Sequence, residues 1–515
     1  MTPEFQNEPL TDFTRPENAR AFAAALEEVR SSFGRTYPLW IGGREVEAGK
    51  TFDSTDPARP DVVLGRFQMG TAAEVDQAVE AARRAFETWQ HETPEKRAAV
   101  LFTAADSMRR RKHWFSAWLV FEVGKSWAEA DADTAEAIDF MEFYGREMLR
   151  YAAKQPLTPV PGEDNELVYL PLGVGAVIPP WNFPNAILTG MTTAALVAGN
   201  TVVLKPSSDA PVIAWQVVQL LAESGLPAGA LNFVSGPGGS VGNRMVEHPK
   251  MRFIAFTGSK DVGLDINQKA ASPRPGQIWI KRVVAEMGGK DSIIVAADAD
   301  LDQAADGVVA SAFGYQGQKC SACSRAIVEK SIYDDFLRRL RERAAKIKVG
   351  PPEQQDNWMG PVINAGAQAK ILEYVETGRR EGRVILGGEA LPGPGHFVTP
   401  TIVADVAPGA TLSQEEIFGP VLAVIQARDW DDAIAIANNT EYGLTGAVYT
   451  RDEGRIQDAK RRFHVGNLYF NRKCTGALVG AHPFGGFNMS GTDSKAGGRD
   501  YLLLFMQAKA MSRRR

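Results

Sequence analysis

The 515-residue chain contains little cysteine and little histidine, three residues of the first and six of the second. An odd and sparse set of cysteines excludes a secreted disulfide framework and favours a reducing compartment. Cys320 and Cys323 form a CxxC pair, but no second pair follows, and no histidines stand four residues apart. We therefore expect neither a zinc site nor a thioredoxin-like redox pair.

The chain also lacks long apolar runs and net positive charge. No run approaches the ~20 apolar residues that cross a bilayer, and the polar N-terminal segment has no signal-peptide pattern. The net charge of −5 gives no field that attracts nucleic acid or anionic lipid. With 44% hydrophobic and 23% charged residues, the composition is that of a globular protein, for which we expect a cytoplasmic location.

Short apolar runs alternate with helical patterns through the middle of the chain. Strands are predicted at VGAVIPP (174–180), TVVLKP (201–206), ALNFVSG (230–236) and RFIAFTGS (252–259). An amphipathic helix is predicted over 210–225, and a second alternating series begins near residue 292 and runs to about 471. A hairpin around a Gly-Gly turn and a helical stretch over 71–154 precede them. Such alternation predicts an α/β fold with an open, mostly parallel sheet.

Cys320 lies in a polar loop, GYQGQKCSACSR (314–325), between a predicted helix and a predicted strand. Structural cysteines prefer apolar neighbours, and the charge of Lys319 would favour the thiolate, which is a strong nucleophile. Cys320 is therefore either a catalytic nucleophile or an incidental loop thiol. Cys323 and Cys474 are interpreted as structural.

A covalent thiol mechanism needs a base and a donor to the oxyanion. Glu286 ends an apolar run and precedes two glycines, so it is either a base or a solvated strand end. Asn182 stands between prolines, where it could donate to an oxyanion or merely form a turn.

A phosphate site is suggested by FTGS (256–259), which ends a predicted strand and opens a helix. Gly258 permits a tight turn, Ser259 can cap the helix, and the free N–H groups there suit an anion. The run SGPGGSVGN (235–243) is interpreted as a turn. Lys205 could reach a ribose or phosphate, or could be a solvated residue at a strand end.

Taken together, these segments resemble the aldehyde dehydrogenase superfamily over nearly the whole chain. The matching motifs, in order, are PWNFP (180–184), TVVLKPS (201–207), FTGS (256–259), EMGGKD (286–291), GQKCSA (317–322), EEIFGPV (415–421), YGLTGAVYT (442–450) and PFGGFNMSG (483–491).

The resemblance implies an α/β aldehyde dehydrogenase fold with a Rossmann-like NAD-binding domain, an α/β catalytic domain and a small β oligomerisation segment. The boundaries that it implies are a helical arm at 1–36, NAD-binding at 37–155 and 174–285, catalysis at 286–472, and oligomerisation at 156–173 and 490–515. A homo-oligomer, either a dimer or a hexamer, is expected.

By the same resemblance, Cys320 is the nucleophile, Glu286 the general base, and Asn182 with the Cys320 N–H the oxyanion hole. Reaction passes through a thiohemiacetal and a thioester on Cys320. NAD is the expected cofactor, with NADP as an alternative because Ser208 stands where NAD-preferring members often carry an acid. The expected cofactor contacts are Pro180, Trp181, Lys205, Ser208, Gly258, Ser259, Glu416 and Phe418.

Within the superfamily the chain resembles the branch that oxidises L-glutamate γ-semialdehyde, the open form of 1-pyrroline-5-carboxylate, in proline degradation. The strings FQNEPLTDF (5–13), AEAIDFMEFYGREMLRY (135–151) and FNRKCTGALVGAHPFGG (470–486) support this branch. The expected substrate contacts are Ser321, Gly476 and Ala477 for the carboxylate, Phe183 and Phe484 for the aliphatic stem, and Glu136 for the ammonium group.

Plainer interpretations of the last three contacts stay open: Phe183 and Phe484 as core residues, and Glu136 on a solvated helix face. Because the chain is too short to include a fused proline dehydrogenase, a separate enzyme is expected to supply the substrate. The alternatives in function are another aldehyde dehydrogenase, for example one for succinic semialdehyde, and a non-catalytic protein on the same scaffold.

Overall fold

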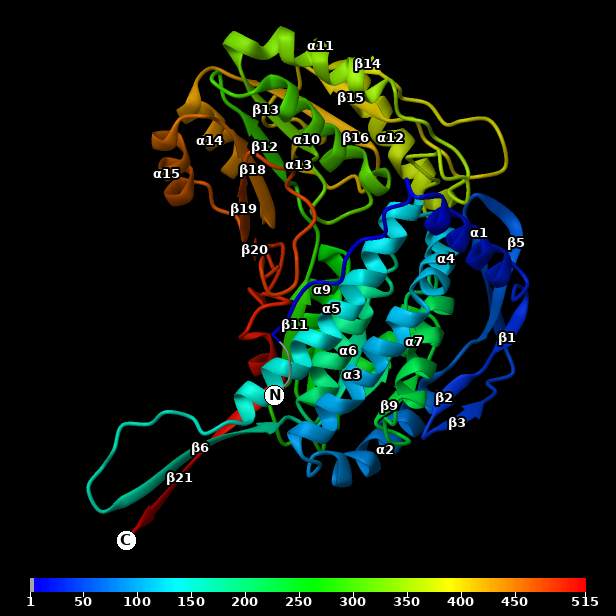
Figure 1. The fold of residues 1–515 in the computed structure, drawn as a ribbon, viewed down its shortest axis with the longest axis vertical. Coiled ribbons are helices and arrows are strands. Elements are labelled where there is room, and N and C mark those ends of the chain that lie inside the picture. Colours follow the sequence, from blue (N-terminus) through cyan, green and yellow to red (C-terminus); the bar gives the residue numbers. More distant parts are fainter. Residues whose placement is uncertain (1–3) are drawn as a thin grey trace.

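The computed structural model describes residues 4–515. It contains two α/β units, each built on a seven-stranded sheet, together with a small three-stranded sheet and a two-stranded arm (Figure 1). The α/β fold predicted from the sequence is confirmed. Residues 1–3 of the segment expected to form an N-terminal arm lie outside the described residues, and the rest of it contains helix α1 (Pro16–Arg30).

The first unit has the strand order β11-β10-β7-β8-β9-β2-β3. Its five central strands are parallel, and the hairpin β2–β3 is added antiparallel at one edge. Gly42 and Gly43 turn this hairpin with φ values of 63° and 78°, a conformation that favours glycine. The strands are β2 (Leu39–Ile41), β3 (Arg44–Val46), β7 (Val174–Ile178), β8 (Thr201–Leu204), β9 (Leu231–Phe233), β10 (Phe253–Thr257) and β11 (Arg282–Glu286).

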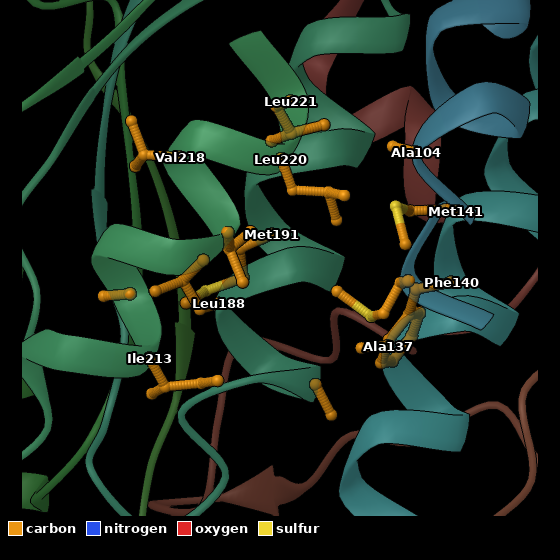
Figure 2. Packing of buried hydrophobic residues seen from close by; sticks show 14 of the residues in the cluster. Ala104, Ala137, Phe140, Met141, Leu188, Met191, Ile213, Val218, Leu220 and Leu221 are labelled. Carbon is orange, nitrogen blue, oxygen red and sulfur yellow. The ribbon is translucent and has the colours of Figure 1, made fainter. Parts of the chain in front are cut away.

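Helices cover both faces of this sheet because its strands are apolar on both sides. Val202 and Leu204 of β8 face one hydrophobic cluster, whereas Val203 between them faces the other. Helices α3 to α7 pack in the first cluster, part of which Figure 2 shows, and α2, α8 and α9 contribute to the second. The helices are α2 (Ala72–Trp89), α3 (Pro94–Arg110), α4 (Lys112–Val123), α5 (Trp127–Ala152), α6 (Ala186–Val197), α7 (Pro211–Glu223), α8 (Asn243–Glu247) and α9 (Lys260–Ala271).

The second unit repeats this layered plan with the strand order β14-β15-β16-β13-β12-β18-β19, parallel except at β14. Its strands are β12 (Ser292–Val295), β13 (Arg325–Glu329), β14 (Arg383–Leu386), β15 (Thr401–Ala404), β16 (Val421–Ala427), β18 (Thr445–Tyr449) and β19 (Asn467–Phe470). Its helices are α10 (Leu301–Phe313), α11 (Tyr333–Ala344), α12 (Ala365–Glu381), α13 (Thr411–Gln414), α14 (Trp430–Asn438) and α15 (Glu453–Arg462), with short helical turns at Gly314–Gly317 (η2) and Lys330–Ile332 (η3).

Smaller sheets complete the fold. Strands β1 (Arg35–Tyr37), β5 (Arg59–Gln68) and β4 (Thr51–Asp56) form a three-stranded sheet beside the first unit, and β17 (Tyr442–Gly443) pairs with β20 (Phe487–Asn488). No helix within residues 4–515 is long and apolar enough to cross a membrane.

The arm pairs β6 (Glu163–Pro171) with β21 (Met506–Arg514) in antiparallel register and projects from the body with the C-terminus at its tip (Figure 1). It covers only part of the segments expected to mediate oligomerisation. The helical turn η4 (Tyr501–Phe505) packs in the core of the first unit instead, with Leu502 and Phe505 fully buried there.

Candidate active site

A strained turn carries the candidate nucleophile Cys320. Just before it, Tyr315 and Gln316 adopt the left-handed conformation, with φ values of 52° and 57°. Each such residue costs about 1–3 kcal/mol, which the surrounding structure must offset. The amide of Gln316 is buried and donates to the carbonyl oxygens of Gly124 at 2.9 Å and Pro361 at 2.8 Å. The position of Cys320 is therefore fixed by segments distant in the sequence.

The Cys320 thiol is partly accessible and lies among acidic groups. Burial raises the pKa of Cys320 well above its ordinary value, and the nearby carboxyl groups of Asp291, Glu416 and Glu286 raise it further. The resting group is therefore the thiol, and a proton must leave it before it can attack a carbonyl carbon.

The sequence suggests that the charge of Lys319 favours the Cys320 thiolate. In the structure Lys319 pairs with Glu129 of α5, with the Nζ–Oε1 distance at 2.7 Å. Burial and three carboxyl groups dominate at Cys320, so the thiol form is favoured despite the adjacent cation.

Glu286 ends β11 and is half-buried, and its carboxylate is held by two protein donors rather than by solvent alone. Its carboxylate accepts hydrogen bonds from the Gly486 N–H at 3.1 Å and from the Ser494 hydroxyl. Burial raises the pKa of Glu286 to about 7, while these two donors and the charge of Lys495 oppose the rise. A carboxyl group that titrates near neutrality is suited to general-base chemistry, so the interpretation as a solvated strand end is wrong.

Asn182 is also buried, with 4% of its surface exposed. Its Nδ2 donates to the carbonyl oxygen of Gln318 at 3.0 Å, two residues before Cys320. The second hydrogen of that amide and the Cys320 N–H have no acceptor among residues 4–515. The turn thus places two free donors close to the candidate nucleophile, the arrangement that an oxyanion requires.

Lys205, at the end of β8, is buried rather than solvated at the strand end. Its Nζ donates to the Pro206 carbonyl oxygen at 2.8 Å. Burial lowers the pKa of Lys205 to about 8, and the carboxyl group of Asp209 opposes this change. Ser208, by contrast, is exposed.

The predicted phosphate segment opens a helix, as expected, but without a side-chain cap. Ser259 precedes α9, and its exposed hydroxyl makes no capping hydrogen bond. The glycine-rich run at 235–243 is not a simple turn, because Gly238–Gly242 form a π-helical turn that leads into α8. Lys205 lies beside the last glycine of that turn.

Glu416, Phe418 and Trp181 meet across the two units. Glu416 accepts the Gly289 N–H at 3.0 Å, and burial raises the pKa of its carboxyl group. The Trp181 and Phe418 rings pack edge to face with centroids 5.5 Å apart. Phe418 holds a left-handed φ of 61°, and Pro180 lies half-buried beside Trp181.

These groups fit a bound dinucleotide. The N-terminus of α9 offers N–H groups for a diphosphate, Gly258 leaves the approach open, and the Ser259 hydroxyl is free. The Lys205 amine and the Glu416 carboxylate are suited to ribose hydroxyl groups.

The expected substrate residues lie on three segments around the Cys320 loop. Phe183 is half-buried and receives the Lys125 Nζ over its ring at 3.7 Å. Glu136 of α5 makes no hydrogen bond or ion pair within residues 4–515, and burial raises its pKa to about 8. It is therefore not on a solvated helix face.

The loop after β19 carries the expected carboxylate site. Gly476 has a left-handed φ of 75°. Within residues 4–515, the N–H groups of Gly476 and Ala477 donate to no acceptor. Ser321 is 8% exposed, and Phe484 is half-buried, with its N–H bonded to the Ala496 carbonyl oxygen at 2.8 Å.

Cys323 and Cys474 are buried in the second unit, at 1% and 0% exposure. The Cys474 Sγ donates to the Ser321 carbonyl oxygen at 3.3 Å, and the Cys474 N–H donates to the Ser311 hydroxyl at 3.2 Å. The Cys474 thiol thus bonds to the residue that follows Cys320, and the burial of both thiols fits their interpretation as structural cysteines.

Several residues of this site were not singled out in the sequence. Asp291 acts on the Cys320 thiol, and Ser494 and Lys495 surround Glu286. Arg472 and Lys473 flank the Gly476 loop. These residues could have been suspected from their position in the sequence, because each lies within about four residues of a motif position.

Comparisons with known proteins agree with this geometry. The sequence pattern of the Aldehyde dehydrogenase family matches residues 44–511. A 1-pyrroline-5-carboxylate dehydrogenase of Geobacillus thermodenitrificans is 57% identical over 99% of both chains. The crystal structure of a 1-pyrroline-5-carboxylate dehydrogenase from Thermus with bound NAD has a TM-score of 0.98 and 50% identity, covering 100% of both chains. Proline utilization A from Bdellovibrio bacteriovorus has a TM-score of 0.98 and 46% identity over 99% of this chain and 53% of that one.

Proposed function

The chain belongs to the aldehyde dehydrogenase family, and from this we propose that it oxidises L-glutamate γ-semialdehyde to L-glutamate with NAD. The observation that carries the proposal is 57% identity over 99% of the length of a 1-pyrroline-5-carboxylate dehydrogenase. The three groups that the chemistry needs, Cys320, Glu286 and Asn182, all lie around one site. A non-catalytic protein on this scaffold would not need to keep all three.

The first step is addition of the Cys320 sulfur to the aldehyde carbon, after the thiol has given its proton to solvent water. The carbonyl oxygen becomes an alkoxide, which accepts hydrogen bonds from the Asn182 Nδ2 and the Cys320 N–H. These donors stabilise the charge where it develops, an effect worth about 3–4 kcal/mol per donor in comparable sites. Bound NAD supplies the hydride acceptor that converts the thiohemiacetal on Cys320 into a thioester.

Glu286 acts in the second half of the reaction. At neutral pH about half of a carboxyl group with a pKa of about 7 is ionised, so it can take a proton from water. The resulting hydroxide attacks the thioester carbon, the carbon–sulfur bond breaks, and L-glutamate leaves Cys320 as the free nucleophile. Ser494 and Gly486 hold the carboxylate in place for this step.

We also propose that the substrate carboxylate is bound by the free N–H groups of Gly476 and Ala477 and by the Ser321 hydroxyl. Phe183 and Phe484 would flank the aliphatic stem, and the unpaired Glu136 carboxylate would receive the ammonium group. Backbone N–H groups suit this task because they are fixed in place. They also bind an anion without the cost of removing a fully charged side chain from water.

The units of the fold suggest a division of labour. We assign cofactor binding to residues 37–155 and 174–285 and catalysis to 286–472. The projecting β6–β21 arm, with two unpaired strand edges, is suited to contact another copy of the chain. A dimer or hexamer built through this arm is the proposed assembly.

We propose that the semialdehyde comes from an oxidation of proline. The similarity to proline utilization A, over 53% of that chain, supports this link to the use of proline.

Steady-state kinetics test the proposed function. We expect NAD-dependent turnover of L-glutamate γ-semialdehyde, in equilibrium with 1-pyrroline-5-carboxylate, with a higher kcat/KM than for succinic semialdehyde. Equal or faster turnover of succinic semialdehyde would replace the proposal with that alternative. The same assay with NADP tests the cofactor preference at Ser208.

A further inference from the structure

We propose that Lys473 is a specificity-determining residue, whose ammonium group selects aldehydes that carry a carboxylate at the far end from the carbonyl. The inference rests on the proposed function and adds a charged side chain to a carboxylate site otherwise made of backbone donors and one hydroxyl.

The first argument is position. A Cβ atom placed on Gly476 would lie 3.2 Å from the Lys473 Cε and 3.4 Å from its Nζ. The ammonium group therefore lies directly beside the loop whose N–H groups have no acceptor within residues 4–515. Three donors of positive character, Lys473 and the N–H groups of Gly476 and Ala477, gather at one place.

The second argument is the lack of a protein partner. Lys319 pairs with Glu129 at 2.7 Å, and Lys125 pairs with Asp133 at 2.9 Å. The Lys473 ammonium group, in contrast, makes no hydrogen bond or ion pair in the described chain, and the residue is exposed to solvent. An ammonium group without a counter-ion beside free N–H groups is complementary to an anion from outside.

The surroundings do not neutralise this group. Burial lowers the pKa of Lys473, and the charge of Lys319 lowers it further, while Glu129 opposes the change. Glu129 already pairs with Lys319, so one carboxylate is shared between two ammonium groups. Because Arg472 also lies nearby, positive charge is locally in excess, which favours binding of an anionic substrate.

The adjacent Arg472 has a different task. Its guanidinium donates to the carbonyl oxygens of Thr475 at 3.0 Å and Gly476 at 2.9 Å, and it stacks on the Tyr469 ring at 4.4 Å. The carbonyl groups of the loop are therefore occupied, which leaves N–H donors as its free groups. Arg472 is a positioning residue, whereas Lys473 keeps its charge available.

The distribution of charge also matches a zwitterion. The cation Lys473 stands at the Gly476 loop, and the unpaired carboxylate of Glu136 stands on α5. An α-amino acid carries both complementary charges on one carbon. An aldehyde without them would leave the Lys473 ammonium group and the buried Glu136 carboxyl group without partners, which penalises its binding.

The test compares Lys473→Gln and Lys473→Arg on two substrates. The first is L-glutamate γ-semialdehyde, and the second is propanal, which has no carboxylate. We expect Lys473→Gln to lower kcat/KM for the semialdehyde about tenfold, mainly through KM, and to leave propanal turnover unchanged. Lys473→Arg should recover most of the loss. Product inhibition by L-glutamate should weaken in parallel.

Lys154→Gln, at an exposed position after α5, is the matched control and should change neither substrate. An equal loss on both aldehydes, or no loss on either, would overturn the inference, because a structural role cannot discriminate between them. Failure of the proposed function would give a different result, because the unaltered enzyme would then oxidise propanal but not the semialdehyde. That result would also refute the inference about Lys473.

Discussion

Replacing Ser494 by alanine removes one of the two donors that hold the Glu286 carboxylate. Ser494 is 3% exposed and donates its hydroxyl to Glu286. Burial raises the pKa of Glu286 to about 7, and this hydrogen bond is the largest influence that opposes the rise. In the Ser494→Ala variant, the charged form of Glu286 loses that support and its pKa must increase.

The size of the change follows from the strength of the bond. A hydrogen bond to a charged group contributes about 1.5–3 kcal/mol. At about 1.4 kcal/mol per pKa unit, the pKa of Glu286 should rise by about one to two units. The ionised base is the active form, so activity is present above this pKa and lost as the pH falls through it. At pH 7 the variant should hydrolyse the thioester about 5 to 50 times more slowly, and the defect should fade by about pH 9.5.

A single-turnover experiment isolates the step. Enzyme in excess over the semialdehyde, with saturating NAD, is mixed rapidly and quenched, and release of L-glutamate is followed between pH 5.5 and 9.5. NADH absorbance in the same mixture reports formation of the thioester, which should depend far less on Ser494. The midpoint of the release profile then reports the pKa of the base.

Ser490→Ala provides the matched control. Ser490 is a fully buried serine of the same segment, but its hydroxyl accepts the Gly443 N–H and does not contact Glu286. We expect its release profile to keep the original midpoint. An unchanged midpoint in Ser494→Ala, or an equal shift in both variants, would refute Glu286 as the base held by this hydroxyl.

Two further predictions concern the nucleophile and the core. Cys320→Ala should abolish NADH formation, because the other two cysteines are buried and cannot replace the nucleophile. A fluorescence titration should still detect NAD binding. Residual turnover would contradict the thioester mechanism. Lys125→Met should lower the free energy of unfolding by about 3–5 kcal/mol, measured by urea denaturation, because it leaves Asp133 charged, buried and unpaired. The exposed pair of Lys96 offers the comparison, since Lys96→Met should cost about 0–1 kcal/mol; equal losses would refute the assigned role of burial.

The layered fold was predictable because its signals are local. Val202, Val203 and Leu204 form an apolar run that is buried on both sides, as a central parallel strand requires. The Gly42–Gly43 pair marks a hairpin because few other residues adopt its left-handed conformation. Neither feature depends on a distant part of the chain.

The environment of the site residues was not predictable in the same way. Glu286 receives its hydrogen bonds from residues 200 and 208 positions later in the sequence. Lys319 pairs with a residue 190 positions earlier, and the pKa of the neighbouring thiol is set instead by burial and by carboxyl groups from distant segments. The pKa of a site residue depends on charges and burial that the folded chain brings together. A sequence pattern identifies the residue but not these surroundings.

Lys473 illustrates the same limit. Its segment, RKCTG (472–476), carries two adjacent cations, and the carboxylate site was predicted from Ser321, Gly476 and Ala477 without them. Only the hydrogen bonds distinguish Arg472 from Lys473. The Arg472 guanidinium donates to carbonyl oxygens of the loop, whereas the Lys473 ammonium group does not.

The hydrogen bonds that hold Glu286 also bear on how the enzyme is made. A ribosome adds Gly486 and Ser494 after more than nine-tenths of the chain, so a nascent polypeptide has its nucleophile long before its base has any support. A chain that ends before Gly486 therefore lacks both donors that hold the base, and it also lacks Leu502 and Phe505, which the first core buries. We therefore expect hydrolysis of the thioester to depend on the C-terminal segment as much as on the motif that carries Glu286.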